Sequence, residues 1–462
     1  MSEADRPGRR MARRRGPALR GQTLRGGRLR YWLMPGIGVK RWLALVLAGE
    51  LALALAGAFV LKQVYREIIV TGPLQGVVYV LTLQFLPYGL RAIPFLVAGI
   101  VAFSVGVLQL TRTLLLPFGE PSGPLVEVIY QKRYLARGPR VVAIGGGTGL
   151  SALLRGLKEH TSNITAVVTV ADDGGSSGKL RAELGIAPMG DIRNCIAALA
   201  DTEPLMTRLL QYRFPEDAAL APGLGGHAFG NLLIAAMSAI EDDFQEGVRQ
   251  SNRVLAVRGQ VVPAAPVPLT LHARLADGAE MHGQSSIARA KGIERVWVTP
   301  SDVRSTVEVL EAIAEADFIV MGPGSLYTSL LPSLLIPEVR DAVAASRALR
   351  CYVCNVATQV GETEGYGLAA HLAALTLHVG PGLVDVVLAN DDFSAAPPAD
   401  GRSQPVRLDW VRPAGGPDLV TRHVVDPQNA HRHDSDLLAA ALMEILQERG
   451  RSRPLLHVAS SA

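Results

Sequence analysis

The chain has few cysteines and few charged residues for its length. Three cysteines occur among 462 residues, a low and odd number that excludes a framework of structural disulfides and is typical of a reducing compartment. Cys351 and Cys354 form a C-x-x-C, but no second cysteine pair or nearby ligand cluster completes a zinc site. We therefore interpret them as buried residues of a strand.

Charged residues make up only 19% of the chain and apolar residues 48%, and the apolar excess is local. Residues 43–61 contain one charge, Glu50, and residues 92–110 contain none, so each segment is long enough to cross a bilayer as a helix. The apolar stretch 76–90 is shorter and has two interpretations, either an interfacial or re-entrant piece or a third span. We favour two spans, with 62–91 as the outside loop.

Positive charge is concentrated at the start of the chain. Residues 1–41 contain twelve Arg and Lys against two acidic residues, whereas the remainder has more acidic than basic residues. This pattern predicts a basic, disordered tail rather than a signal peptide, and it excludes a nucleic-acid-binding domain as the source of the charge. The positive-inside rule then predicts a two-pass protein of the cell membrane, with its N-terminus and large C-terminal domain both cytoplasmic.

The remaining sequence predicts a linker over 112–139, an α/β domain over 140–450 and a tail over 451–462. Strand and helix patterns alternate, which predicts an α/β, Rossmann-like, mostly parallel sheet with helices on both faces, preceded by two transmembrane helices. The segment 269–290 is a candidate antiparallel excursion. The expected strands are 141–144, 164–170, 295–299, 318–321, 351–356 and 384–389, and the expected helices are 150–160, 191–200, 231–240, 306–316, 367–378 and 437–447.

Two glycine-rich segments carry the strongest functional signal. GGGTG, beginning at Gly145, and DDGGSSGK, beginning at Asp172, each follow an apolar strand pattern. Glycine lets the backbone approach an anion closely, and a helix N-terminus binds phosphate. Because Leu150 replaces the third dinucleotide glycine and no Gly-Lys-Ser/Thr follows, we interpret the first loop as a nonstandard phosphate or sugar site. Two tight turns without a ligand are the alternative.

The acidic end of the second segment has several interpretations. Asp172 ends a strand, where an acid binds ribose hydroxyls in α/β nucleotide proteins. Alternatively, Asp172 and Asp173 together could bind Mg²⁺ through water molecules. Ser176 and Ser177 are candidates for contacts with phosphate. A solvated Asp–Gly turn is the structural alternative.

Two motifs that precede expected helices add further candidates. GDIRNC places Asp191 as an N-cap, with Arg193 and Asn194 towards the ligand. GGHAFGN places His227 before a helix, where it is either a general acid or base or a structural histidine.

Two later motifs also follow strands. GPGSLYTS places Ser325, Thr328 and Ser329 on the first turn of a helix with free N–H groups. NVATQVGETEG, beginning at Asn355, forms a dense polar loop. All these loops leave the carboxyl ends of strands, the edge at which open α/β sheets bind ligands.

Taken in order, GGGTGLS, TVADDGGSSGKLR, GDIRNC, HAFGN, GPGSLYTS, CNVATQVGETEGY and the late RHD at 432–434 resemble the YvcK-like gluconeogenesis factors. These share a superfamily with the CofD-like 2-phospho-L-lactate transferases, and the resemblance covers about residues 140–446. It implies a Rossmann-like fold, binding of a UDP-sugar such as UDP-N-acetylglucosamine, and regulation of cell shape and wall synthesis during gluconeogenic growth. It also implies cell-wall synthesis proteins as partners and two N-terminal membrane helices in some members. We further expect a homo-oligomer.

The motifs and the resemblance together select the ligand-binding candidates. Tyr366 suits stacking on a base or sugar, and Arg432 suits a diphosphate. The sequence departs from the family after Tyr366, where GLAAH replaces the usual Thr- and Asp-containing continuation. The candidates are Gly145, Gly147, Thr148, Asp172, Asp173, Ser176, Ser177, Arg193, Asn194, His227, Asn231, Gly324, Ser325, Asn355, Tyr366 and Arg432.

Three functions stay open at this stage. The first is a membrane-tethered nucleotide-sugar-binding regulator without turnover, because phosphate-cradling loops occur without an evident nucleophile–base pair. The second is a transferase acting on a nucleotide diphosphate-linked or phosphorylated substrate, with Mg²⁺ on Asp172 or Asp173 and His227 as base. The third, an NAD(P)-dependent enzyme, is disfavoured by the glycine spacing. No other cofactor and no nucleic-acid partner is expected.

Overall fold

The computed structural model describes residues 134–200, 203–216, 224–394 and 402–450, together with 75–81, 85–87 and scattered single residues between 50 and 104. It divides into two units, Met1–Arg133 and Tyr134–Ala462, and each is described by itself.

The first unit contains the described helix α3 (Gln75–Leu81). The predicted spans 43–61 and 92–110 lie mainly outside the described residues, as do the predicted tails and most of the linker. Within the described part of the chain, no helix has the length and apolar character needed to cross a bilayer. The two-span arrangement therefore stays a prediction.

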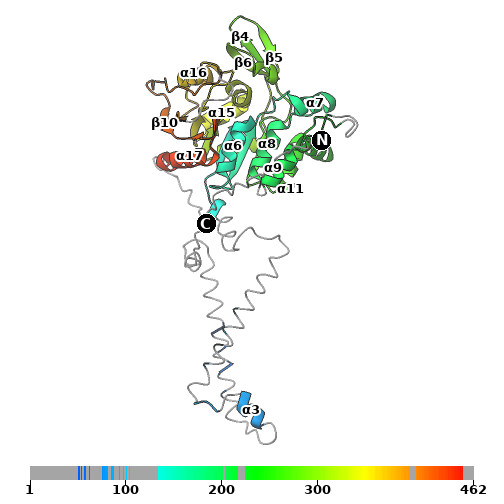
Figure 1. Ribbon diagram of the computed structural model, residues 1–462, viewed down its shortest axis with the longest axis vertical. Coiled ribbons are helices and arrows are strands. Elements are labelled where there is room, and N and C mark those ends of the chain that lie inside the picture. The colour runs from blue at the N-terminus through cyan, green and yellow to red at the C-terminus, as the bar shows by residue number, and fades with distance from the viewer. Residues whose placement is uncertain are drawn as a thin grey trace, which may run out of the picture. The chain divides into compact units, whose positions relative to one another are not determined.

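The second unit is built on a seven-stranded sheet in which every neighbouring pair is parallel, which confirms the predicted α/β architecture (Figure 1). The strands β1, β2, β7 and β9 are buried along their whole length, as expected for apolar strands covered on both faces. In sheet order the strands are β10 (Asp418–Arg422), β9 (Val386–Asn390), β8 (Leu349–Val353), β7 (Phe318–Met321), β1 (Val141–Gly145), β2 (Ile164–Val168) and β3 (Gln260–Pro263).

The strand order places a topological switch point between β1 and β7. From β1 the chain adds β2 and then β3 on one side, and β7, β8, β9 and β10 follow on the other side. Val141 of β1 is in register with Ile164 of β2 and with Phe318 of β7. Ligands of open α/β sheets bind beyond the carboxyl ends of the strands at such a point.

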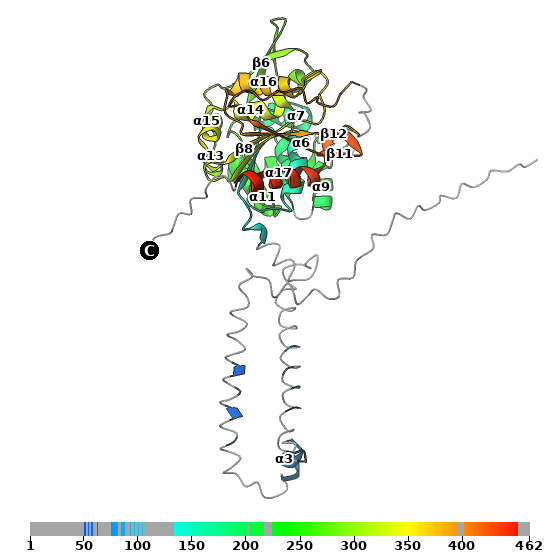
Figure 2. The same ribbon diagram turned by 90° about the vertical axis from the view of Figure 1, so that its left-hand side faces the viewer.

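Helices cover both faces of this sheet, as predicted. α6, α8 and α17 pack together on one face, and α13, α14 and α15 lie on the other (Figure 2). The helices of the second unit are α6 (Gly147–Leu157), α7 (Gly175–Leu184), α8 (Gly190–Leu199), α9 (Glu203–Gln211), α10 (Phe229–Glu241), α11 (Phe244–Val254), α12 (Gln284–Ile287), α13 (Val307–Ala314), the π-helix η3 (Leu326–Leu330), α14 (Leu331–Leu334), α15 (Pro337–Ala345), α16 (Leu368–Val379) and α17 (Ser435–Gly450).

One expected strand belongs to a different sheet. β6 (Ile293–Thr299) pairs antiparallel with β4 (Thr270–Leu275), which also pairs antiparallel with β5 (Glu280–His282). The antiparallel excursion at 269–290 is thus confirmed, and the expected strand 295–299 joins it rather than the parallel sheet. A two-stranded antiparallel ribbon, β11 (Val425–Asp426) and β12 (Asn429–His433), precedes α17.

Candidate functional site

The glycine loop after β1 packs directly on the glycine loop after β7. A Cβ atom on Gly149 would lie 2.7 Å from the carbonyl oxygen of Pro323 and 3.0 Å from the Cα of Gly324. The two backbones therefore approach more closely than a side chain at this position allows. Because α6 begins at Gly147, this contact brings the first turn of α6 to the switch point.

Asn355, a predicted ligand residue, fixes the second of these loops. Its Nδ2 donates to the carbonyl oxygen of Gly324 at 2.9 Å, and its Oδ1 accepts from the N–H of Gly324 at 3.1 Å. Both ends of the side-chain amide are therefore paired with one residue, so Asn355 positions the loop that lines the site.

Two adjoining pockets lie over the first turns of α6, and we term them together the switch-point cleft. The smaller has a volume of about 110 Å³ and the larger about 540 Å³. Thr148 and Arg432 line both, so the N-terminus of α6 and an arginine guanidinium belong to one hollow. The predicted ligand residues that line the cleft are Gly147, Thr148, Asn194, Gly324, Ser325, Asn355 and Arg432.

Arg432 lies near the end of β12, and the two residues that follow it are both held by hydrogen bonds. His433 is buried, and its Nε2 donates to the carbonyl oxygen of Cys354 at 3.2 Å. Burial lowers the pKa of His433 to about 4, so the ring is neutral at pH 7. Asp434 Oδ1 accepts from the N–H groups of Asp436 and Leu437, each at 2.9 Å, and so caps α17. The two flanking anchors leave Arg432 directed to the cleft.

Ser176 is the centre of a second group of predicted residues, held together by hydrogen bonds. Its Oγ accepts from the N–H of Ala228 and from Asn231 Nδ2, both at 3.1 Å, and lies 3.4 Å from His227 Nδ1. Asn231 Nδ2 also donates to Ser177 Oγ at 3.3 Å. We call Ser176, Ser177, His227 and Asn231 the Ser176 cluster.

Arg193 connects the Ser176 cluster to the switch-point cleft. Its Nη1 donates to Asn231 Oδ1 and its Nη2 to Asn194 Oδ1, each at 3.2 Å. Asn194 in turn lines the larger pocket of the cleft. The start of α8, which carries Arg193 and Asn194, therefore connects the Ser176 cluster to the switch-point cleft.

The two adjacent acids turn to different partners. Asp172 Oδ1 accepts from the N–H of Gly174 at 2.9 Å, whereas Asp173 Oδ1 accepts from the N–H of Ser285 at 2.8 Å. Burial raises the pKa of Asp172. Across the described ranges, no three His, Cys, Asp or Glu side chains gather as a metal site would require. Cys351 and Cys354 are free and buried in or next to β8, as predicted.

The prediction that Asp191 caps α8 is wrong. The N-cap is Met189, and Asp191 lies one residue inside the helix because Gly190 already has helical conformation. The Asp191 carboxylate instead packs against Gly146, the N-cap of α6, and its Oδ2 is buried without a hydrogen-bond partner. Burial, with the charge of Asp172 adding to it, raises the pKa of Asp191 to about 7.

The prediction of free N–H groups after β7 is also wrong, because Glu362 occupies them. Its Oε1 accepts from the N–H groups of Tyr327 at 2.6 Å and Thr328 at 3.1 Å, and its Oε2 accepts from Thr328 Oγ1 at 3.0 Å. Burial raises the pKa of this carboxyl to about 7. Ser325 still lines the cleft, but the N-terminus of η3 already holds an internal anion.

Two predicted candidates, Gly145 and Tyr366, lie near the cleft but do not line it, whereas Gln359, which was not a candidate, does. Gly145 ends β1 behind the cleft. Tyr366 joins an aromatic group, with its hydroxyl 3.0 Å from that of Tyr327 and its ring edge-on to His371. Gln359, which the sequence marked only as part of a polar loop, donates to Ser325 Oγ at 2.8 Å and lines the cleft. Its Oε1 is buried without a partner, so it is a site residue that sequence reasoning missed.

Comparison with known proteins agrees with this architecture. The family model of 2-phospho-L-lactate transferase CofD matches residues 141–419. A gluconeogenesis factor from Nostoc sp. is 44% identical over 434 residues, which is 89% of this chain and 91% of that protein.

Two shorter proteins match about two thirds of this chain. The gluconeogenesis factor of Bacillus subtilis is 44% identical over 321 residues, 67% of this chain and 99% of that protein. A crystal structure of a Bacillus halodurans protein superposes with a TM-score of 0.62 at 45% identity, covering 66% of this chain and 100% of the other. The chain therefore belongs to the gluconeogenesis factor family and shares its α/β domain with 2-phospho-L-lactate transferase CofD.

Proposed function

We propose that the protein is a membrane-tethered regulator that binds a UDP-sugar, such as UDP-N-acetylglucosamine, in the switch-point cleft. The observation that carries the proposal is the placement of Arg432 in the same hollow as the first turn of α6. A helix N-terminus and a guanidinium are two complementary groups for a diphosphate. The cleft volumes of about 110 and 540 Å³ leave room beside the diphosphate for further ligand groups.

The hydrogen bonding around the cleft supports binding rather than turnover. Asn355 is paired with Gly324, Asn231 with Arg193 and the Ser176 cluster, and Glu362 with the start of η3. Side chains held in this way fix the shape of a site. The function we propose is therefore recognition of the nucleotide sugar.

Exposed apolar side chains in the first unit support tethering to the cell membrane. Leu51, Val97 and Ile100 are 63%, 54% and 58% exposed, within the segments predicted to span the bilayer. The Nostoc relative matches beyond the α/β unit, whereas the Bacillus subtilis relative consists of little else. By analogy with the family, we propose that the protein regulates cell shape and wall synthesis during gluconeogenic growth. The proposed partners are wall-synthesis proteins, and we propose that the chain forms a homo-oligomer.

Calorimetric titration of the full chain in detergent tests the proposed ligand. The ligands are UDP-N-acetylglucosamine, UDP-glucose, GDP, GTP and NAD at one salt concentration. Saturable binding of a UDP-sugar, with weaker or no binding of the others, is the expected result. Tight binding of a guanine nucleotide or NAD without UDP-sugar binding would overturn the proposal.

The alternative is a transferase of the CofD type that uses Mg²⁺. The supporting observation is a pair of half-buried carboxyls, Asp172 and Asp191, whose pKa values are both raised, that of Asp191 in part by the charge of Asp172. These two residues would hold the ion, which would supply charge for phosphoryl stabilisation. Mg²⁺-dependent product formation from a nucleotide diphosphate-linked substrate, lost in Asp172→Asn, would establish turnover in place of simple binding.

A further inference from the structure

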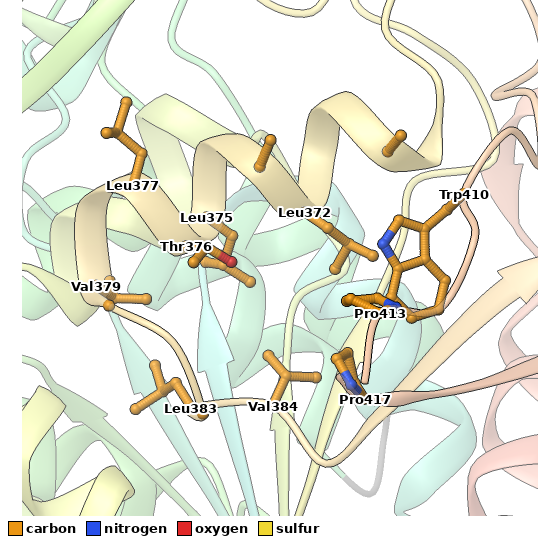
Figure 3. Close-up of a pocket in the computed structure, with 14 residues that line it drawn as sticks. Leu372, Leu375, Thr376, Leu377, Val379, Leu383, Val384, Trp410, Pro413 and Pro417 are labelled. Atoms are coloured by element: carbon orange, nitrogen blue, oxygen red, sulfur yellow. The ribbon is translucent and has the colours of Figure 1, made fainter. Parts of the chain in front are cut away.

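The larger pocket of the switch-point cleft is lined almost entirely by polar side chains. Among the described residues that line it, only Ala152 is apolar. By contrast, the hollow beside α16, of about 440 Å³, is apolar apart from Thr376 and the indole nitrogen of Trp410 (Figure 3). Aromatic and aliphatic side chains suit the flat face of a base, whereas hydroxyl, amide and carboxylate groups suit the hydroxyls of a sugar. The larger pocket therefore has the lining of a sugar site.

This pocket extends along α6, away from the expected position of the diphosphate. Thr148 lies in the first turn of α6 and Arg155 in its last turn, and both line the pocket. Seven residues of an α-helix rise by roughly 10 Å. A group attached to a diphosphate at the N-terminus of α6 would therefore have room to lie alongside this helix.

One wall of the pocket is supplied by α9. Thr207 and Gln211 lie four residues apart, on one face of this helix, and both line the pocket. Thr207 Oγ1 is buried and has no hydrogen-bond partner among the described residues. An unpaired buried hydroxyl costs free energy, which a ligand hydroxyl that pairs with it would recover. Asn194 adds an amide whose Oδ1 accepts from Arg193, so its Nδ2 points away from that guanidinium.

The charges around the pocket oppose a second anion on the ligand. Two arginines line it, and one of them, Arg432, is assigned to the diphosphate. Three aspartates line it as well, namely Asp426, Asp434 and Asp436. They would repel a carboxylate on the sugar, whereas neutral hydroxyls can donate hydrogen bonds to them. The pocket therefore suits a neutral sugar better than a uronic acid.

We propose that the larger pocket is the sugar subsite of the cleft, that Thr207 and Gln211 select the sugar, and that the three aspartates restrict it to neutral hexoses and N-acetylhexosamines. This inference rests on the proposed binding of a nucleotide sugar. It adds that α9 recognises the sugar separately from the diphosphate, which meets Arg432 and the start of α6.

Calorimetric titration of the full chain in detergent tests the subsite, with UDP and UDP-N-acetylglucosamine as the two ligands. We expect Thr207→Val and Gln211→Ala each to weaken binding of the UDP-sugar about fivefold, the effect of one hydrogen bond, and to leave UDP binding unchanged. Thr376→Val, in the hollow beside α16, is the matched control and should bind both ligands like the wild type. Thr207→Val removes an unpaired hydroxyl at nearly constant volume, so urea should unfold it no more easily than the wild type.

A second pair of ligands tests the restriction to neutral sugars. UDP-glucuronic acid carries a carboxylate where UDP-glucose carries a hydroxymethyl group. It should bind about fivefold more weakly than UDP-glucose, the scale of one unfavourable charge pair near the surface. Asp436→Asn should reduce this difference. Equal affinity of the wild type for the two ligands would contradict the restriction.

The outcomes separate this inference from the proposed function. Unchanged affinity for UDP-N-acetylglucosamine in both α9 variants would overturn the subsite and leave the proposed function standing. An equal loss of affinity for UDP and for the UDP-sugar would also overturn it, because these residues would then not read the sugar. Failure of the wild type to bind any UDP-sugar would overturn the proposed function itself, and the subsite with it.

Discussion

The carboxylate of Asp191, in the first turn of α8, packs against Gly146, the N-cap of α6, so closely that a Cβ atom on Gly146 would overlap Asp191 Oδ2. This contact joins the helix that faces the switch-point cleft to the helix that carries Arg193 and Asn194. It also places a half-buried carboxyl at the N-terminus of α6, next to the position where a phosphate is expected.

Asp191→Asn should stabilise the ligand-free protein more at pH 8 than at pH 5. The pKa of Asp191 rises from its ordinary 3.8 to about 7 on folding, so between these values the folded state binds more protons than the unfolded state. The contribution of this group to stability therefore falls as pH rises through that window. Asn keeps the shape of the side chain without the charge, and we expect a gain of roughly 1–3 kcal/mol at pH 8. Urea unfolding at both pH values measures the free energy of unfolding, with a substitution at the exposed Asp341, Asp341→Asn, as the control. Equal stability of wild type and Asp191→Asn at pH 8 would contradict a raised pKa for Asp191.

Glu362→Ala should destabilise the protein more than Glu362→Gln. Alanine leaves the N–H groups of Tyr327 and Thr328 and the hydroxyl of Thr328 without their acceptor in a buried site. We expect a loss of about 2–5 kcal/mol for Ala, and roughly half of that for Gln, which keeps one acceptor oxygen. Chemical denaturation checks the order, and a loss for Gln that equals the loss for Ala would argue against capping by the carboxylate oxygens.

Gly149→Ala should damage both stability and ligand affinity. The new methyl group would meet Pro323 and Gly324 at 2.7 to 3.0 Å, so the two glycine loops must separate. Overpacking of this kind destabilises by roughly 1–3 kcal/mol. Gly225→Ala is the matched control, because its Cβ would find its nearest neighbours at 3.4 Å. If both variants bind and unfold like the wild type, the close loop contact is not what shapes the cleft.

Ser176→Ala tests whether the Ser176 cluster is structural. The substitution removes the acceptor of Ala228 N–H and Asn231 Nδ2, and leaving these buried donors unpaired costs about 1–3 kcal/mol. The exposed Ser286→Ala should have no effect on the unfolding free energy. An unchanged stability accompanied by loss of a measured turnover would instead favour the transferase alternative, with His227 acting on substrate.

Much of the fold could be predicted because local patterns decide it. The apolar runs that end in glycine at β1 and before Pro323 identify two central strands and the edge at which the site lies. β6 was placed in the wrong sheet because its pairing partner, β4, is chosen by tertiary packing. β3 was missed because it has only four residues and ends in a proline. α7 was missed because GGSSGK has the composition of a turn, although Gly175 to Gly178 already belong to the helix.

The site was less predictable than the fold, because its important pairings join residues far apart in the chain. Asp191 had the sequence context of a cap, yet Gly190 starts the helix one residue earlier, and the carboxylate lies against Gly146. Glu362 reaches 34 residues back to Thr328. The family motifs named Arg432, which lines the cleft, but gave no indication that His433 and Asp434 anchor the chain on its far side.

The most direct test of the proposed function is titration of UDP-N-acetylglucosamine into wild type, Arg432→Ala and Arg304→Ala. Arg304 is 86% exposed and absent from the cleft lining, so its variant controls for the loss of one positive charge. We expect Arg432→Ala to weaken binding by roughly 1–3 kcal/mol, about 5- to 150-fold in Kd, and Arg304→Ala to bind like the wild type. Equal affinity of all three proteins, or no binding by the wild type, would contradict it.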